Sequence, residues 1–110
     1  MQYAQVANVI SGIGYPYAYR AFPDNTKKSP PYIVYFYDGN DDFYADNINY
    51  QEIVGLRIEL YTRNKDFTAE AAVETALRNA DISWVKDEVY VEEEKMYLIV
   101  YESEVIINGE

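Results

Sequence analysis

The middle of the chain carries the clearest alternation of apolar and polar positions. Leu56, Ile58 and Leu60 are separated by Arg57 and Glu59, and a two-residue period of this kind predicts a half-buried β-strand. The apolar side chains would face a core and the charged ones would face outward. We expect this strand to be the centre of the fold, because a helical pattern follows it within a few residues.

That helical pattern runs from Ala69 to Ala80. Its apolar residues recur at steps of three and four positions, which places them in one stripe along a helix. Thr68 stands just before the stripe, and we expect its hydroxyl to cap the first turn. Glu70 in that turn favours the positive end of the helix dipole. The sequence therefore predicts a helix that begins next to Thr68.

The segments on either side predict a second helix and several more strands. Residues from Tyr3 to Ile13 form an amphipathic pattern that ends at Gly12, Gly14 and Pro16. In chain order we then expect a brief strand at Tyr17–Phe22, a loop over residues 24–31 and a strand at Pro31–Tyr37 that is covered on both faces. A turn at Asp38-Gly39, a short strand at Phe43–Ala45 and a polar connection at Asp46–Gln51 should follow. The chain should end in a hairpin of Trp84–Val91 and Met96–Ile107, joined by an acidic turn at Glu92–Lys95.

This order of elements predicts an α+β fold, with a mostly antiparallel β-sheet and two α-helices packed on one face. A chain of 110 residues is expected to form a single domain, residues 1–110. Its 49% hydrophobic and 25% charged residues are typical of a folded chain rather than a disordered one. No apolar run is long enough for a membrane span and no signal peptide is predicted, so we expect a soluble chain with no membrane partner.

The chain contains no cysteine and no histidine, and its net charge is -10. These absences exclude disulfides, thiolate nucleophiles, histidine general bases and zinc sites built on either residue. The negative charge opposes tight binding to nucleic-acid phosphates, which normally depends on lysine and arginine. We expect neither an enzyme nor a cofactor, and a carboxylate-only active site is the enzymatic alternative that stays open.

One acidic motif resembles the start of a calcium loop. Asp38, Asn40 and Asp42 stand at alternate positions, as oxygen ligands do in such a loop. Phe43 and Asn49 then occupy the positions where the loop requires glycine and glutamate. We therefore expect a solvated turn here and no metal site.

The 13 tyrosines are the unusual feature of the composition. Tyrosine favours half-buried sheet surfaces and interfaces, where the ring packs and the hydroxyl stays in contact with water. One small core cannot enclose all of them, so several are expected on the surface, and exposed aromatic area usually marks an association face. Edge strands would offer further unpaired backbone to neighbouring chains.

Short sequence blocks add a family resemblance that covers nearly the whole chain. The blocks are an N-terminal amphipathic helix, SPPYIVY at residues 29–35, FYADN at residues 43–47, VGLRIELYT at residues 54–62 followed by a helix, and MYLIVYE at residues 96–102. In this order they resemble the head-to-tail joining proteins of long-tailed bacteriophages and prophages. Within that group the chain is most similar to the tail terminator, or tail completion, proteins.

The resemblance implies a structural virion protein without known catalytic chemistry or cofactor. Such proteins form hexameric rings that stop tail-tube polymerisation and present a surface to the head connector or head-closure protein. The implied partners are therefore further copies of the chain, the tail tube protein and the connector. The implied location is the virion tail or neck, reached from the cytoplasm of the bacterial host during assembly. DNA would only pass through the ring, and we expect carboxylates lining it to repel the phosphates.

Two polar segments, Asp24–Ser29 and Gly39–Tyr50, are expected to contact the tail tube or the connector, because they lack apolar periodicity. The candidate contact residues within them are Asp24, Asn25, Lys27, Lys28, Asn40, Asp42, Tyr44, Asn47 and Tyr50. Arg57, Glu59 and Tyr61, on the outer face of the central strand, are candidate subunit-interface residues. Ordinary cross-strand or solvent-facing charges are the alternative interpretation of Arg57 and Glu59.

Two other functions fit the same sequence. Another neck or minor capsid component, such as a head-closure protein, would share the size, the acidity and the lack of catalytic groups. A small acidic regulator that mimics DNA would use the net charge of -10 directly. The mimic should be a monomer or dimer with its carboxylates gathered on one face, whereas a terminator should assemble into rings and bind tail tubes.

Overall fold

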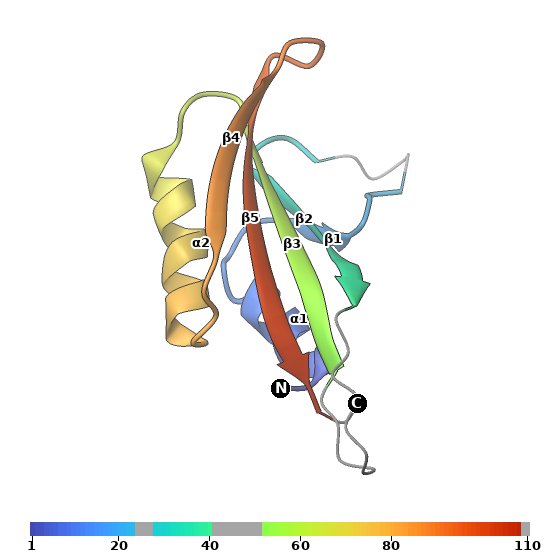
Figure 1. Ribbon diagram of the computed structural model, residues 1–110. Helices are drawn as coiled ribbons and strands as arrows, with labels where there is room; N and C mark the ends of the chain where they lie inside the picture. Colours follow the sequence, from blue (N-terminus) through green and yellow to red (C-terminus); the bar gives the residue numbers. More distant parts are fainter. Residues whose placement is uncertain (24–27, 41–51, 109–110) are drawn as a thin grey trace.

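The computed structural model describes residues 1–23, 28–40 and 52–108. These residues form α1 (Tyr3–Ser11), β1 (Tyr17–Tyr19), β2 (Tyr32–Asn40), β3 (Glu52–Thr62), α2 (Phe67–Asn79), β4 (Val85–Val91) and β5 (Met96–Ile107). The strands form one sheet in the order β1-β2-β3-β5-β4, with both helices on the same side (Figure 1). Among the described strands, only β1 and β2 are parallel neighbours. The predicted α+β fold, with a mostly antiparallel sheet and two helices on one face, is confirmed.

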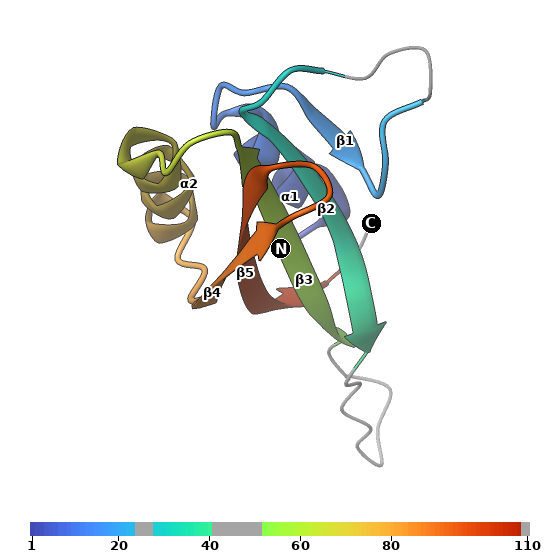
Figure 2. The same cartoon turned by 90° about the horizontal axis from the view of Figure 1, so that it is seen from above.

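The predicted central strand is β3, which lies between β2 and β5. Its buried residues alternate with half-buried ones along the whole strand. Leu56, Ile58 and Leu60 face the helices, as the sequence pattern indicates, while Arg57 and Glu59 project from the opposite side. In the view of Figure 2, β1 and β4 lie at opposite edges of the sheet.

The core fills the space between the sheet and the two helices. Val6 and Ile10 of α1 and Ala69, Val73 and Leu77 of α2 are all 0% exposed. Each fully buried aliphatic side chain contributes about 1.5–3 kcal/mol to folding, so this layer supplies most of the hydrophobic stabilisation. Its partners on the sheet include Ile33, Tyr35, Val54, Leu56, Ile58, Leu60, Ile99, Tyr101, Val105 and Ile107.

The cap of α2 differs from the prediction. Asp66 is the N-cap, and its carboxylate accepts a hydrogen bond of 2.9 Å from the backbone N–H of Ala69. Thr68 already lies inside the first turn, because the helix begins at Phe67. Aspartate and threonine are both good N-caps, and the earlier of the two is used.

Strand β1 is shorter than predicted, ending at Tyr19 instead of Phe22. Arg20 adopts a positive φ of 67°, which does not continue an extended strand. The N–H of Ala21 then donates to the carbonyl of Tyr19 at 2.8 Å, which closes a tight turn.

The predicted turn at Asp38-Gly39 is wrong, because β2 continues through both residues to Asn40. The register between β2 and β3 shifts between Tyr37 and Asn40, and Gly39 has a φ of 79°, so these residues form an irregular, bulged stretch. The glycine signal therefore marks a bulge. The predicted short strand at Phe43–Ala45 lies outside the described residues.

The predicted C-terminal hairpin is confirmed, with β4 starting at Val85 instead of Trp84. Strand β4 is exposed over nearly its whole length, because it pairs only with β5 among the described strands. Trp84, just before the strand, contacts the core instead.

A buried ion-pair cluster joins α2 to β4. Glu70 of α2 is 2% exposed, and its two carboxylate oxygens lie 2.6 Å from Lys65 Nζ and 2.8 Å from Lys86 Nζ, without well-directed hydrogen bonds. Lys86 also pairs with Glu74, and Lys65 with Glu88. Burial alone would raise the pKa of Glu70, but the two lysines outweigh it and hold the pKa below its ordinary value.

Gly55→Ala tests the close contact between β3 and the bulge in β2. A Cβ at Gly55 would lie 2.2 Å from the carbonyl oxygen of Asp38, which is backbone and cannot rotate away. We expect the variant to lose about 2 kcal/mol or more of unfolding free energy, measured by urea denaturation, because overpacking forces the backbone to shift. Gly12→Ala, where the nearest atom is 3.3 Å away, is the control. Equal losses for the two variants would contradict the contact.

Glu70→Gln tests the ion-pair cluster through its pH dependence. Because the pKa of Glu70 is lowered in the folded state, its stabilisation is complete above the ordinary glutamate pKa and is lost as the pH falls through the lower folded pKa. At neutral pH we expect a loss smaller than the about 3–5 kcal/mol typical of a broken buried ion pair, because both lysines reach solvent.

The difference between wild type and Glu70→Gln in urea midpoint should shrink at acid pH. Glu93→Gln, which neutralises an exposed carboxylate in the hairpin turn, should behave like wild type at both pH values. A difference that stays constant with pH would show that the charge of Glu70 does not stabilise the fold.

Candidate subunit-contact surface

The sheet has one face that no helix of the described residues covers, here called the open face. Three rows of residues cross it from β2 to β4: Phe36, Arg57, Glu102 and Val85; Val34, Glu59, Val100 and Asp87; Tyr32, Tyr61, Leu98 and Val89. Strand alternation puts them there, because their neighbours along each strand face the core. Val34 and Val100 are nevertheless buried, so part of this face is closed by something other than a helix.

The segment that follows β1 closes part of the open face. Arg20 lies over the ring of Phe36 at 4.6 Å from its centroid, and Phe22 meets Tyr32 edge to face at 5.4 Å between centroids. A groove of about 300 Å³ remains between Arg20–Pro23 and the sheet, lined also by Glu59, Tyr61 and Glu94. The segment therefore narrows the open face at the β1 side.

The three predicted interface residues form one hydrogen-bonded row on the open face. The carboxylate of Glu59 accepts from Arg57 Nε at 2.8 Å and from the hydroxyl of Tyr61 at 2.9 Å. Arg57 also donates to Glu102 on β5 at 2.9 Å. The ring of Tyr61 stacks on Tyr32 at 5.0 Å between centroids. The side chains of Arg57 and Glu59 are only 28% and 13% exposed, so they stabilise the subunit's own surface.

The electrostatics of this row favour the charged forms of its ion pairs. Burial lowers the pKa of Arg57, but the hydrogen bonds and charges of Glu59 and Glu102 outweigh burial and raise it overall. Burial, together with the hydrogen bond to Glu59, raises the pKa of Tyr61 far above its ordinary value. Tyr61 therefore stays a neutral hydrogen-bond donor, and the row can fix the shape of the surface without offering an acid or base.

At the β4 side the open face is apolar and exposed. Val85 is 74% exposed and Val89 is 44% exposed, and both point to the same side as Val100 and Glu102. A shallow groove of about 330 Å³ lies between these valines and Arg57. Exposed valines on a sheet edge are unusual for a surface that meets only water.

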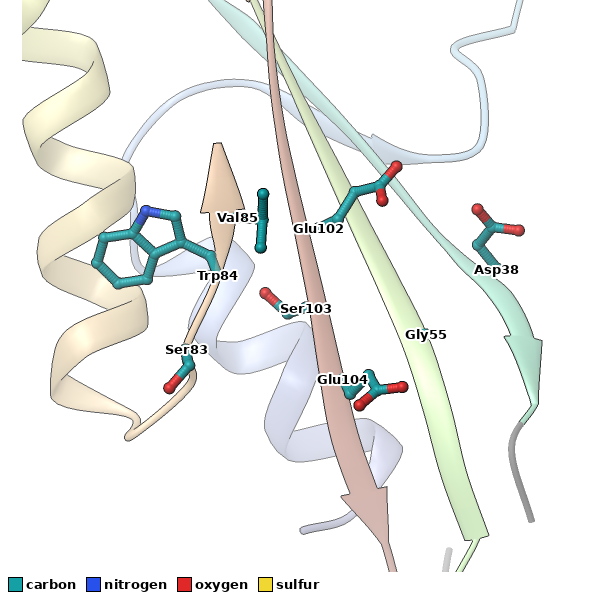
Figure 3. A pocket seen from close by; sticks show the side chains of 8 residues that line it. All are labelled: Asp38, Gly55, Ser83, Trp84, Val85, Glu102, Ser103 and Glu104. Atoms are coloured by element: carbon teal, nitrogen blue, oxygen red, sulfur yellow. The ribbon is translucent and has the colours of Figure 1, made fainter. Parts of the chain in front are cut away.

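A wider hollow of about 630 Å³ lies where β4 begins. Figure 3 shows Trp84 directed toward α2, whereas Glu102 and Glu104 point away from it, on the side of Asp38. Ser83 and Ser103 supply the hydroxyls. Carboxylates and hydroxyls spread over an open hollow repel anions and do not form a desolvated acid–base pair.

The other predicted contact residues are mostly not described. Asp24, Asn25, Lys27, Asp42, Tyr44, Asn47 and Tyr50 lie outside the described residues, and so does most of the segment Gly39–Tyr50. Lys28 is exposed beside the hairpin turn, in a hollow shared with Glu93 and Glu94. Asn40 is the last residue of β2. The structure brings together Arg57, Glu59 and Tyr61 and leaves the role of the loops a prediction.

The sequence predicted surface tyrosines, but it did not predict that several of them would cluster at one edge of the sheet. Tyr17 and Tyr19 of β1 are exposed by 43% and 48%, and Tyr19 contacts Tyr35 and Tyr37, with ring centroids 5.3 and 5.9 Å apart. Tyr37 also meets Tyr3 of α1 at 4.9 Å. Burial and the neighbouring phenols raise the pKa of Tyr37 to about 12. The spacing of tyrosines in β1 and β2 was the available signal, and only the pairing of these strands turns it into a cluster.

Within residues 1–23, 28–40 and 52–108, no group of three or more aspartate or glutamate side chains is arranged to hold a metal ion. No helix among them is long and apolar enough to cross a membrane.

The fold is similar to that of a known virion chain. No model of a protein family matches the sequence, and no curated protein matches it. Among solved structures, a chain of the structure titled "Virion of native gene transfer agent (GTA) particle" superposes with a TM-score of 0.59, covering 94% of this chain and 86% of that chain. The two sequences are 17% identical, so the likeness is one of fold.

Arg57→Gln tests whether the row on the open face stabilises the subunit. The variant leaves the half-buried Glu59 without its cation, and a buried hydrogen-bonding group that loses a partner costs about 1–3 kcal/mol. We expect the unfolding free energy to fall by this amount in urea denaturation. Glu104→Gln, at an exposed position of the same face, should change it by less than about 0.5 kcal/mol. An equal effect of the two substitutions would mean that Arg57 contributes nothing specific.

Proposed function

We propose that this chain is a structural protein of a phage-like virion, and specifically a tail terminator. In this role it forms a ring, expected to be a homo-hexamer, that caps the tail tube and joins it to the head connector. The observation that carries the proposal is the fold likeness to a virion chain over nearly the full length of both proteins. The short blocks of residues 29–35, 54–62 and 96–102 support the terminator role within that class.

The surface chemistry supports a contact function. On the open face Arg57 forms ion pairs with Glu59 and Glu102, and exposed aromatic and aliphatic residues lie at the two edges of the sheet. Surfaces of this kind suit chain-to-chain contact better than capture of a small molecule, which needs an enclosed apolar pocket with a few polar groups. The loops Asp24–Ser29 and Gly39–Tyr50 remain the proposed contacts with the tube or the connector.

The acidic character also suits a ring around DNA. Glu102 and Glu104 are exposed on the open face. If the open face lines the ring, these carboxylates repel the phosphates of a genome that passes through without binding.

Two alternative functions are consistent with part of these observations. A head-closure or minor capsid protein would fit the fold likeness equally well and differ only in its partner. A DNA mimic would require the carboxylates on one surface. In the described chain they are divided among the buried cluster at Glu70, the hairpin turn at Glu92–Glu94 and the open face, which favours the virion reading.

The proposal is tested by adding the purified protein to tail tubes of a long-tailed, phage-like particle from the same source, prepared without this protein. Electron microscopy should show one ring at a single end of each tube, and capped tubes should then attach to DNA-filled heads. Protein that binds heads but not tubes would indicate the neck or capsid alternative. Protein that binds neither but displaces DNA from a basic protein would indicate the mimic.

A further inference from the structure

We propose that copies of this chain join head to tail through the two edges of their sheets, with β4 of one copy lying against β1 and Arg20 of the next. The inference rests on the proposed function and identifies the subunit contact of the ring. It requires a heterologous interface, in which two different surfaces of the same chain meet and the rotation between copies closes the ring.

Among the described residues the backbone of both edges is unpaired on its outer side, except that the carbonyl of Tyr19 already accepts a hydrogen bond from the N–H of Ala21. Among the described strands, β1 pairs only with β2 and β4 pairs only with β5. Following the pairings across the sheet, β1 and β4 run in opposite directions. Two sheets placed side by side in the same orientation would therefore pair β4 with β1 in antiparallel fashion, which is the more stable arrangement.

The charges of the two edges are complementary. Arg20 has no ion-pair partner among the described residues and lies on the open face over Phe36. Asp87 of β4 lies on the same face at the other edge, and no cation pairs with it within the described chain. From Val85 to Asn108 carboxylates outnumber the two lysines several-fold, whereas residues 1–23 and 28–40 contain only Arg20, Lys28 and Asp38 as charged side chains.

The same charges oppose the alternative in which β4 pairs with a second β4. A two-fold contact would bring Asp87 and Glu88 of one copy near the same residues of the other, and like charges facing each other across strands are destabilising. Both edges also expose apolar side chains, although on opposite faces of the sheet: Val85 and Val89 lie on the open face, whereas Tyr17 and Tyr19 lie on the helix-covered side with Ile33 and Tyr35.

Single cysteines test the contact, because the natural chain contains none. Ala18→Cys and Val89→Cys place one thiol on each edge of the open face. Within one molecule the two positions are four strand spacings, about 19 Å, apart, which is too far for a disulfide. We expect mild oxidation of a mixture of the two variants, at the highest concentration the protein tolerates, to give covalent dimers that contain one copy of each.

Each variant alone should remain a single chain on a non-reducing gel. Dimers of Val89→Cys alone would show that β4 pairs with itself, and the absence of any covalent product would show that the edges do not meet; either result overturns the inference. Thr75→Cys, on the exposed side of α2, is the matched control and should cross-link with neither variant.

A charge exchange provides a second readout. Arg20→Glu in the Ala18→Cys chain should lower the yield of mixed dimer several-fold, and Asp87→Arg in the Val89→Cys chain should restore it. An unchanged yield would overturn the assigned charge contact. If tubes are capped but mixed dimers do not form, the inference fails and the proposed function stands. If mixed dimers form but tubes are not capped, the edge contact between copies stands and the proposed tail-terminator function fails.

Discussion

The antiparallel pairing of β3 with β5 is the interaction on which the rest of the structure depends. All eleven residues of β3 have a partner on β5, and this register decides which side chains face the helices. A slip of one residue would turn Leu56 and Ile58 toward solvent and carry Arg57 into the core. Because the apolar set on the wrong side would lose its burial, the register is strongly determined. The core, the open face and the positions of both edge strands follow from it.

The sequence predicted those elements whose periodicity is continuous and missed those decided by a neighbour. The alternation in β3 and the apolar stripe of α2 were sufficient, because each pattern fits only one side of its element. The bulge in β2 was not predictable, since Asp38-Gly39 is a turn signal locally. It becomes part of a strand because Gly55, distant in sequence, leaves room for the carbonyl of Asp38. The prediction of the α2 N-cap was wrong for a smaller reason, because Asp66 and Thr68 are two good capping residues that stand close together.

The candidate surface was also predictable only where it depends on local alternation and not on strand pairing. Alternation alone put Arg57, Glu59 and Tyr61 on one face, and the structure adds that Glu59 holds the other two. The contact between Arg57 and Glu102 depends on the register between two strands separated by α2 and β4, which no local pattern reveals. Strand β4 was predicted as part of the C-terminal hairpin, and it lies at an edge of the sheet because, among the described strands, it pairs only with β5.

The two faces and the two edges of the sheet have different physical roles. The helix-covered face buries its apolar residues in the core, together with the hydroxyls of Thr62 and Ser103, which have no hydrogen-bond partner among the described residues. The open face pairs its central charges with one another. The exposed features that could contact another chain are backbone groups, valines and Arg20, and these lie toward the edges. Because these edges differ in charge and in the kind of apolar side chain they expose, a contact between like edges is disfavoured. A sheet with two different edges favours assembly in one head-to-tail direction, which is the kind of interface that a closed ring requires.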